Sequence, residues 1–241
     1  ALYGLSIGFT KNNGIIKETD FTRYNTRFNA LFNFTKRFTG STNLSFSYNE
    51  QNLKDQGIAD KTAPVFLSLI KAPFLNDKEV NDKGVESPNL AERDTFGISN
   101  PAVIIDDMLA QNKYYRFMGT FGFNYELSAN WKASTTIGVV YDKIRENFFV
   151  PKKGIANDTL SNAIADSRMG TQVKRGFSIY NDTRLEYKKI YQDVHNFVAR
   201  VGMRYQSNKA SQHYALGFNS STDDLTSVQN GVNALRQVGG G

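Results

Sequence analysis

The stretch FTRYNTRFNALFNFTK at residues 21–36 decides the fold, because apolar and polar side chains alternate along it. Its even positions carry aromatic side chains such as Tyr24 and Phe28, whereas Arg27 stands among the polar side chains of the odd positions. Successive side chains of a β-strand point to opposite faces of a sheet. We therefore predict an extended strand with one apolar and one polar face.

The same two-residue period recurs in seven segments and does not slip within any of them. Besides 21–36, the segments are 3–10, 41–50, 114–126, 131–142, 177–188 and 196–205. Most run to about 10–16 residues, whereas strands of soluble proteins favour about 5–6 and a tilted bilayer crossing needs about 9–11. These lengths favour membrane-spanning strands over a soluble β-sandwich, whose strands also alternate.

The connections between the segments alternate between short and long. The predicted tight turns are 36–41, 127–131 and 189–195. The predicted long loops are 51–112, 148–172 and the chain after residue 206. Outer-membrane β-barrels have short turns on the periplasmic side and long loops outside. One outer connection, residues 11–20, is short, and its Asn13-Gly14 pair predicts a tight turn.

Aromatic side chains lie near the ends of the apolar faces, as in the interfacial girdles of membrane barrels. The predicted girdle consists of Tyr24, Tyr48, Tyr125, Trp131, Tyr141, Tyr187 and Tyr205. An Arg turned toward the bilayer midplane would cost about 2–4 kcal/mol, so we expect the polar face to line a wet lumen. The predicted lumen-facing charged residues are Arg23, Arg27, Arg116, Asp142, Asp182, Arg184, Glu186, Arg200 and Arg204. They could guide a solute, hold a plug through charge pairs, or only hydrate and cross-brace the lumen.

Composition excludes several other classes of protein. No apolar run reaches 18 residues, so a transmembrane helix is not expected. The net charge of +6 is spread along the chain without a nucleic-acid-binding motif. The chain has no Cys, and its two His lack zinc-site spacing. No nucleophile stands in an elbow or triad context, so we expect neither an enzyme nor a bound cofactor.

Acidic pairs at Asp106-Asp107 and Asp223-Asp224 raise the question of a calcium site. Calcium needs six to eight converging oxygen ligands, and neither pair belongs to an EF-hand-like array. We expect solvated loop carboxylates, with His195 in a turn and His213 in a loop, and no metal site.

Seven strands are too few and odd in number for a closed bacterial barrel, which is usually even. Either further strands precede Ala1 and follow Gly241, or the chain is an eight-stranded barrel with one strand not recognised. Both ends of the chain look cut, because no leader precedes Ala1 and residues 239–241 follow an unfinished segment.

The chain resembles the SusC/RagA family of TonB-linked outer-membrane transporters over essentially its whole length. The resemblance is carried by diffuse barrel patterns, namely FTRYNTRFNALFNFTK (21–36), STNLSFSYNE (41–50), YYRFMGTFGFNY (114–125), YDKIRENFFVP (141–151) and NSSTDDLTSVQNGVNALRQVGGG (219–241). It implies that residues 1–241 are part of one 22-stranded barrel domain. It also implies a plug, energy supplied through TonB, and a SusD-like surface lipoprotein over the outer mouth. This sequence shows no plug and no TonB box.

The loop at 51–112 carries the pattern of a short helix near residues 63–71, with Thr62 as a cap ahead of Pro64 and Pro73 after its end. Its apolar side chains could contact the lipoprotein or pack the loop against its neighbours. These side chains are Val65, Phe66, Leu69 and Ile70.

We expect a segment of a bacterial outer-membrane transporter that imports oligosaccharides or peptides. The alternative is a complete small outer-membrane barrel that acts as an adhesin or structural anchor. A third class, a soluble sugar-binding sheet protein, would purify without detergent.

Overall fold

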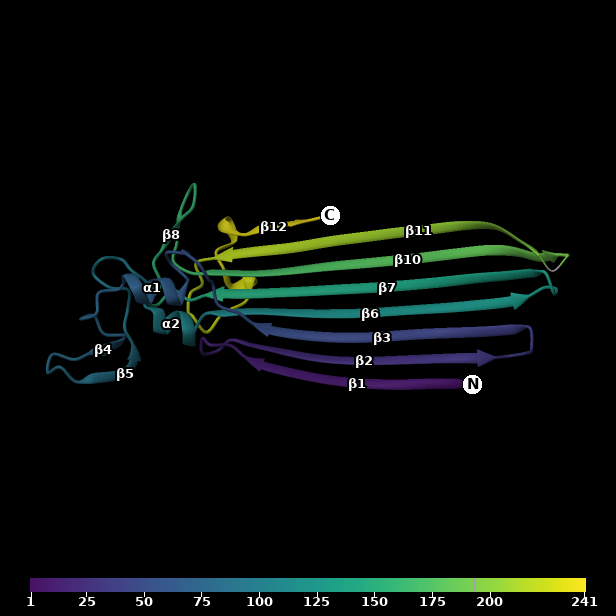
Figure 1. Ribbon diagram of the computed structural model, residues 1–241. Coiled ribbons are helices and arrows are strands. Elements are labelled where there is room, and N and C mark those ends of the chain that lie inside the picture. The colour runs from purple at the N-terminus through teal and green to yellow at the C-terminus, as the bar shows by residue number, and fades with distance from the viewer. Residues whose placement is uncertain (193) are drawn as a thin grey trace.

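The computed structural model describes residues 1–192 and 194–241, and its main feature is one antiparallel sheet (Figure 1). The sheet contains β1 (Leu2–Asn13), β2 (Asp20–Asn33), β3 (Phe38–Asn52), β6 (Leu109–Glu126), β7 (Trp131–Val150), β10 (Arg168–Tyr191), β11 (His195–Phe218) and β12 (Gln237–Gly240), paired in that order. The all-β, antiparallel fold class predicted from the sequence is confirmed. Among the described residues, no helix is both long and apolar enough to cross a membrane.

The pairing register keeps every apolar row on one face of the sheet. Phe28 pairs with Leu44, and Leu44 pairs with Gly119, while the neighbouring row joins Arg27 to Ser45. No register shift occurs between the described long strands. A one-residue slip would exchange the two faces, so the alternation of side chains fixes the pairing.

Three strands extend well beyond their predicted ends. β7 has 20 residues, and β10 and β11 have 24 each. The prediction of a loop after residue 206 is wrong, because β11 continues to Phe218 in register with the first half of β10. Residues 207–218 read SNKASQHYALGF, which has no consistently apolar face, so the alternation that marked the earlier strands is missing. Backbone pairing with β10 sustains the strand instead.

The short turns after β2 and β6 lie at one end of the sheet, and the long loops lie at the other (Figure 1). The turn at 127–130 matches the prediction, whereas the first turn lies at 34–37 and not at the predicted 36–41, because β3 already begins at Phe38. The third predicted turn includes residue 193, which lies outside the described residues. At the loop end, the tight turn predicted at Asn13-Gly14 is wrong. Six residues connect β1 to β2, the Gly14 N–H donates to the Thr19 carbonyl at 2.8 Å, and the left-handed residue is Glu18.

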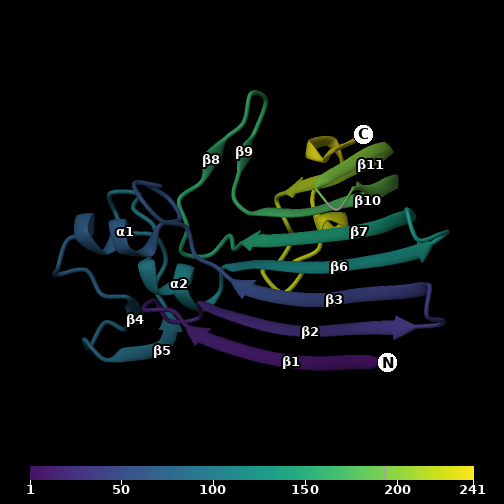
Figure 2. The same cartoon turned by 45° about the vertical axis from the view of Figure 1, so that its right-hand side comes forward.

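The long loops fold into a cap at the loop end of the sheet, from which the β8–β9 hairpin projects (Figure 2). The cap contains α1 (Pro64–Ile70), β4 (Lys78–Val80), β5 (Glu86–Leu90), α2 (Pro101–Asp106), β8 (Asp158–Thr159), β9 (Ile164–Ala165), η1 (Val228–Asn230) and η2 (Asn233–Leu235). Helix α1 lies within the predicted 63–71. Thr62 does not cap it, however, because the residue before the helix is Ala63 and the Thr62 hydroxyl donates to Asp55.

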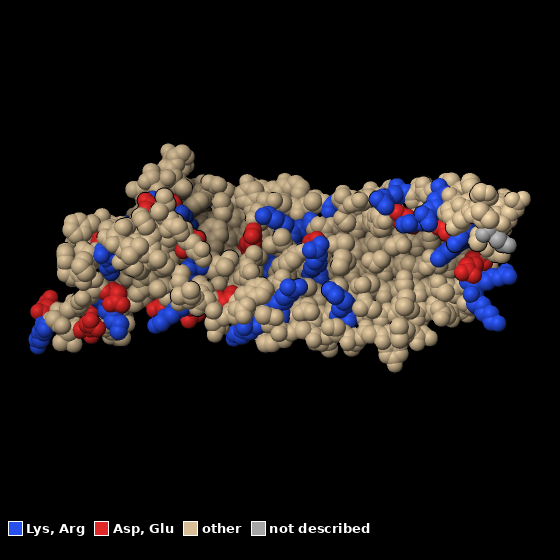
Figure 3. All heavy atoms as spheres, viewed as in Figure 1, with Lys and Arg blue, Asp and Glu red and all other residues tan. Residues whose placement is uncertain are grey.

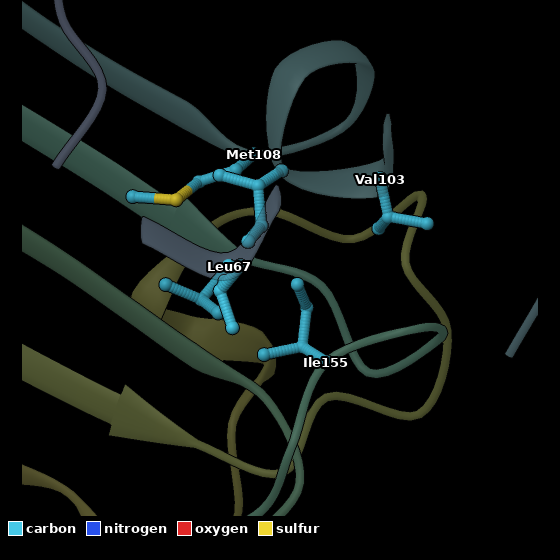
Figure 4. Packing of buried hydrophobic residues seen from close by; sticks show 6 residues of the cluster. Leu67, Val103, Met108 and Ile155 are labelled. Atoms are coloured by element: carbon cyan, nitrogen blue, oxygen red, sulfur yellow. The ribbon is translucent and has the colours of Figure 1, made fainter. Parts of the chain in front are cut away.

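The apolar core of the described residues lies in the cap and not along the sheet. Leu67 of α1 and Val103 of α2 are fully buried and pack with Met108 and Ile155 (Figure 4). Ile104 and Val150 complete this cluster. The faces of the sheet, in contrast, leave many large apolar side chains exposed, such as Ile7 at 76% and Val201 at 76%.

The sheet is open within the described residues. β1 pairs only with β2, and β12 pairs only with four residues of β11. The alternative of a closed eight-stranded barrel does not fit this open sheet, although β12 is an eighth strand. An exposed edge strand offers unpaired backbone groups to a further strand.

Candidate functional site

The polar face of the sheet holds all nine charged residues predicted to line a lumen. The register divides them into two groups along the strands, and Figure 3 shows charged side chains gathered in two such groups with an uncharged band between them. The group nearer the loops contains Arg23, Arg27, Arg116 and Asp142. The group nearer the turns contains Asp182, Arg184, Glu186, Arg200 and Arg204.

Asp182 is the centre of the group nearer the turns, and its side chain is only 11% exposed. Arg204 donates from Nη2 and Nε to Asp182 Oδ2 at 2.9 and 3.1 Å, and Arg184 donates from Nε to Oδ1 at 3.1 Å. The Tyr180 hydroxyl also donates to Oδ2, at 3.2 Å. Both carboxylate oxygens are thus satisfied, and one positive charge of the two guanidinium groups is left over.

Two smaller ion pairs complete the charged network of this face. Arg200 Nε lies 2.5 Å from Glu186 Oε2, and the two residues are directly paired across β10 and β11. Asp142 accepts from the Tyr114 hydroxyl at 2.7 Å and lies 3.4 Å from Arg116 Nε. These pairs brace neighbouring strands against each other, which is one of the roles that the sequence left open.

Arg23 and Arg27 differ from the other predicted residues, because neither forms an ion pair within the described part of the chain. Two apolar side chains that the sequence reasoning missed also lie on this face, namely Met118 and Val140, which pair with each other. The signal available in the sequence was their even numbering, which places both apolar side chains among the polar ones of these segments. The polar face is therefore basic, and Met118 and Val140 add an apolar patch to it.

The apolar face carries many aromatic side chains, and some of them recur at the same spacing on neighbouring strands. On each of four neighbouring strands two of them stand ten residues apart. The pairs are Tyr48 and Phe38 on β3, Tyr115 and Tyr125 on β6, Tyr141 and Trp131 on β7, and Phe177 and Tyr187 on β10. In each pair the first residue is nearer the loops. Some neighbouring members contact one another, with ring centroids 4.8 Å apart for Tyr48 and Tyr115 and for Trp131 and Tyr187.

Across the sheet from β2 to β11, the aromatic residues nearer the loops lie progressively closer to the turn end. Tyr24 and Tyr48 are directly paired, and their rings stack at 6.2 Å. Tyr141 lies two residues nearer the turns than the partner of Tyr115, and Tyr205 pairs with Asn181 near the middle of β10. Strands of a barrel are tilted, so a level belt must step along successive strands in this way.

Asn181 is a polar exception near the middle of the apolar face. Its Nδ2 donates to Thr135 Oγ1 at 3.1 Å, and its Oδ1 accepts from the Thr183 hydroxyl at 3.1 Å. The two hydroxyls are 2.8 Å apart. The three side chains therefore satisfy one another across β7 and β10.

The cap contains the four residues predicted to contact a partner, and they differ in their exposure to solvent. Val65 and Leu69 are 56% and 79% exposed, Ile70 is exposed and Phe66 is partly buried. Leu67, between them, is buried in the cap core. Helix α1 thus packs one face into the cap and leaves Val65, Leu69 and Ile70 exposed on another, so packing within the loop accounts for only part of its apolar residues.

Asn100 organises the cap and was not found from the sequence. It is fully buried, caps α2 by accepting from the Ala102 N–H at 3.1 Å, and donates to the carbonyls of Asp77 and Ala91 at 2.8 and 3.0 Å. Its backbone N–H donates to Gly154 in the next loop at 2.7 Å. The Asn100-Pro101 pair ahead of an apolar run was the available helix-start signal.

Two carboxylates, one of them predicted to be solvated, join the loops together. Asp223 accepts from the backbone N–H groups of Lys152 and Lys153 at 2.7 and 3.0 Å, so the prediction is wrong for this residue. Asp158 binds Lys61 at 2.7 Å and also Arg168. The pKa of Asp158 is lowered by the hydrogen bond from Lys61 and by the charge of Arg168. Burial opposes this shift in part.

The described residues contain no group of three or more His, Asp or Glu side chains arranged to hold a metal ion. His195 and His213 both belong to β11, so the predictions of a turn and a loop position are wrong.

No protein-family model matches the chain, and no curated protein matches it. Solved structures do match its fold. "Structure of the RagAB peptide transporter" matches with a TM-score of 0.69 and 16% identity over 99% of this chain and 27% of that chain. Structures of the RagAB peptide importer in the "open-open" and "closed-closed" states match with TM-scores of 0.68 and 0.71 and identities of 16% and 14%, over 99% of this chain and 26% of theirs. The chain spans about a quarter of the length of these structures, and the likeness shows the fold alone.

Proposed function

We propose that this chain forms part of the wall and the outer loops of an outer-membrane barrel that imports peptides or oligosaccharides. The ten-residue aromatic interval on the apolar face carries the proposal. Ten residues rise about 34 Å along a strand, and a tilt of about 40° reduces this to roughly 26 Å of height. The apolar band of outer-membrane barrels is about 25 Å tall.

The polar face then lines the lumen of the barrel. Its charged network would be costly in lipid but is hydrated in a water-filled or plugged interior. Arg23, Arg27 and the surplus positive charge at Asp182 are available to a plug or to a solute. The open edges at β1 and β12 are then completed by further strands of the same barrel, because unpaired backbone groups are not tolerated in hydrocarbon.

The neighbours by fold favour a transport role over an enzymatic one. Their titles describe a peptide transporter, and peptides are therefore the first substrates to test. A barrel wall of this kind has no energy source of its own, so we propose that transport is driven by TonB through a region outside this chain. We propose the bacterial outer membrane as its location.

The exposed face of α1 fits a protein partner above the barrel mouth. Val65 and Leu69 stand one helical turn apart, and both are exposed on the side of the sheet away from the turns. Exposed apolar side chains held in one ordered element are typical of contact sites. We propose a SusD-like surface lipoprotein as the partner.

Uptake of labelled peptides and oligosaccharides by cells, with and without the full-length protein, tests this function. We expect the protein in the outer-membrane fraction, and uptake that stops when a protonophore collapses the inner-membrane gradient. Leu69→Asp should weaken lipoprotein capture while Ser68→Asp, also exposed on α1, should not. Uptake unaffected by loss of the protein, or recovery of the protein in the soluble fraction, would refute the proposal.

A further inference from the structure

Basic side chains lie on the apolar face immediately beyond the aromatic residues nearer the loops. On each of three adjacent strands a Lys or Arg stands two positions closer to the loops than the aromatic residue. The pairs are Lys113 with Tyr115 on β6, Lys143 with Tyr141 on β7, and Arg175 with Phe177 on β10. Arg145 follows Lys143 on the same face of β7. We call Lys143, Arg145 and Arg175 the basic cluster.

The register brings the basic cluster together. Lys143 pairs directly with Arg175 across β7 and β10. Adjacent strands are about 4.8 Å apart, and Arg145 is displaced from Lys143 by two residues, or about 6.7 Å along the strand. The backbone positions of the three residues thus form a small triangle, and their cationic side chains can reach a single tetrahedral anion.

The charge of the cluster is not neutralised by the protein. Lys113 has Glu50 at 3.2 Å, but no carboxylate pairs with Lys143, Arg145 or Arg175 in the described part of the chain. Lys143 Nζ lies 5.9 Å from the centroid of the Tyr115 ring, and Arg145 and Arg175 are exposed. Like charges directly opposite each other destabilise an antiparallel pair. An external anion would remove this repulsion.

The position of the cluster indicates where that anion comes from. Toward the turns, the same face continues into Tyr141, Phe177, Val139 and Ile179, which are apolar or aromatic. Toward the loops, the strands leave the apolar band. If the apolar face meets lipid, as the proposed function requires, the cluster lies at the level of the lipid headgroups.

We propose that the basic cluster binds the phosphate group of an anionic lipid in the outer leaflet. A guanidinium group forms two parallel hydrogen bonds to phosphate oxygens, and an ammonium group adds a compact positive charge. The acyl chains of the same lipid lie along the apolar rows below. The inference rests on the proposed membrane placement and adds a specific ligand to the outer surface of the barrel wall.

Native mass spectrometry of the full-length protein in detergent tests this site. The probes are phosphatidic acid and diacylglycerol with the same acyl chains, which differ only in the phosphate. We expect retention of phosphatidic acid but not of diacylglycerol. Each basic residue near an anionic membrane surface contributes about fivefold to binding, so Lys143→Gln, Arg145→Gln and Arg175→Gln together should weaken retention roughly a hundredfold.

A matched control removes the same charge from the cap. Lys83→Gln, Arg93→Gln and Arg236→Gln change one Lys and two Arg that are all exposed outside the long strands, and this variant should retain phosphatidic acid as the unmodified protein does. Equal retention by the basic-cluster variant, or equal retention of diacylglycerol, would overturn the inference. Displacement of the lipid by millimolar inorganic phosphate would also overturn it, because the site would then bind free phosphate.

Failure of the lipid site and failure of the proposed function give different results. A protein that reaches the outer membrane and supports uptake, yet binds no phosphatidic acid, disproves only the lipid site. A protein absent from the outer-membrane fraction disproves the membrane placement as well.

Discussion

Trp131 on β7 and Tyr187 on β10 are directly paired, with ring centroids 4.8 Å apart, and each stands ten residues from an aromatic residue nearer the loops on its own strand. This repeated interval defines a band on one face of the sheet that matches the height of a bilayer core. Substitutions inside the band, as well as at its edges, can therefore test this placement.

A charge placed in the middle of the band should distinguish the two faces. Ile137 lies on the apolar face of β7, and Thr136, its neighbour on the polar face, pairs with Asp182. We expect Ile137→Arg to lower the free energy of unfolding in lipid vesicles by about 2–4 kcal/mol. Thr136→Arg should cost much less if the polar face lines a wet lumen, because the added charge stays hydrated there. Urea titration of the full-length protein in vesicles measures both, and equal costs would argue against a lipid-facing apolar side.

The Asn181 network should respond differently to partial and complete removal. Thr135→Val with Thr183→Val leaves the Asn181 side chain without its two hydroxyl partners, and an unsatisfied polar group costs about 1–3 kcal/mol. Adding Asn181→Leu removes the stranded amide, so we expect the triple variant to regain most of the lost stability. The same urea titration reads out the effect. A triple variant less stable than the double would contradict the role of the network.

The cap should loosen when Asn100 is changed. Asn100→Ala removes side-chain hydrogen bonds to three backbone groups in a fully buried position, and each group left unsatisfied costs about 1–3 kcal/mol. Hydrogen exchange of the full-length protein should show faster exchange in residues 77–106, with the long strands unchanged. Asn89→Ala is the control, because Asn89 is exposed. Unchanged exchange in the Asn100 variant would show that the cap core alone fixes these loops.

The link between Lys61 and Asp158 should depend on pH at the acidic end. The pKa of Asp158 is lowered by the hydrogen bond from Lys61 and by Arg168. A lowered pKa in the folded state means that the stabilisation is fully present above the ordinary Asp pKa of about 3.9 and is lost as the pH falls through the lower value. Exchange around residues 151–167, corrected for intrinsic rates, should therefore accelerate between pH 5 and pH 3. In Asp158→Asn, exchange of these residues should be fast at both pH values. If the variant shows the same acceleration at low pH as the unmodified protein, Asp158 is not the cause.

The sequence was most informative where one side of a strand meets a uniform environment. The alternation in residues 21–36 and 131–142 followed directly from two chemically different faces, so strand register and the side of each charged residue could be predicted. The second half of β11 had no such contrast, because polar residues interrupt both faces of residues 207–218, and its pairing with β10 was missed.

The cap was less predictable because its contacts join residues far apart in sequence. Asn100 binds groups from residues 77, 91 and 154, and Asp223 binds backbone groups of the loop after β7. Asn181 was also missed, since its position on the apolar face makes sense only when Thr135 and Thr183 are seen beside it. Local patterns do not contain these partners.

Spin-label accessibility along β7 tests the membrane placement most directly. The chain has no Cys, so single Cys residues can be introduced at positions 133–140 of the full-length protein, with any other Cys removed, and labelled in lipid vesicles. We predict that labels at 133, 137 and 139 are accessible to oxygen dissolved in lipid, and that labels at 134, 136 and 140 are shielded from it. Uniform accessibility to a water-soluble relaxation agent at all positions, or the opposite alternation, would contradict a lipid-facing wall.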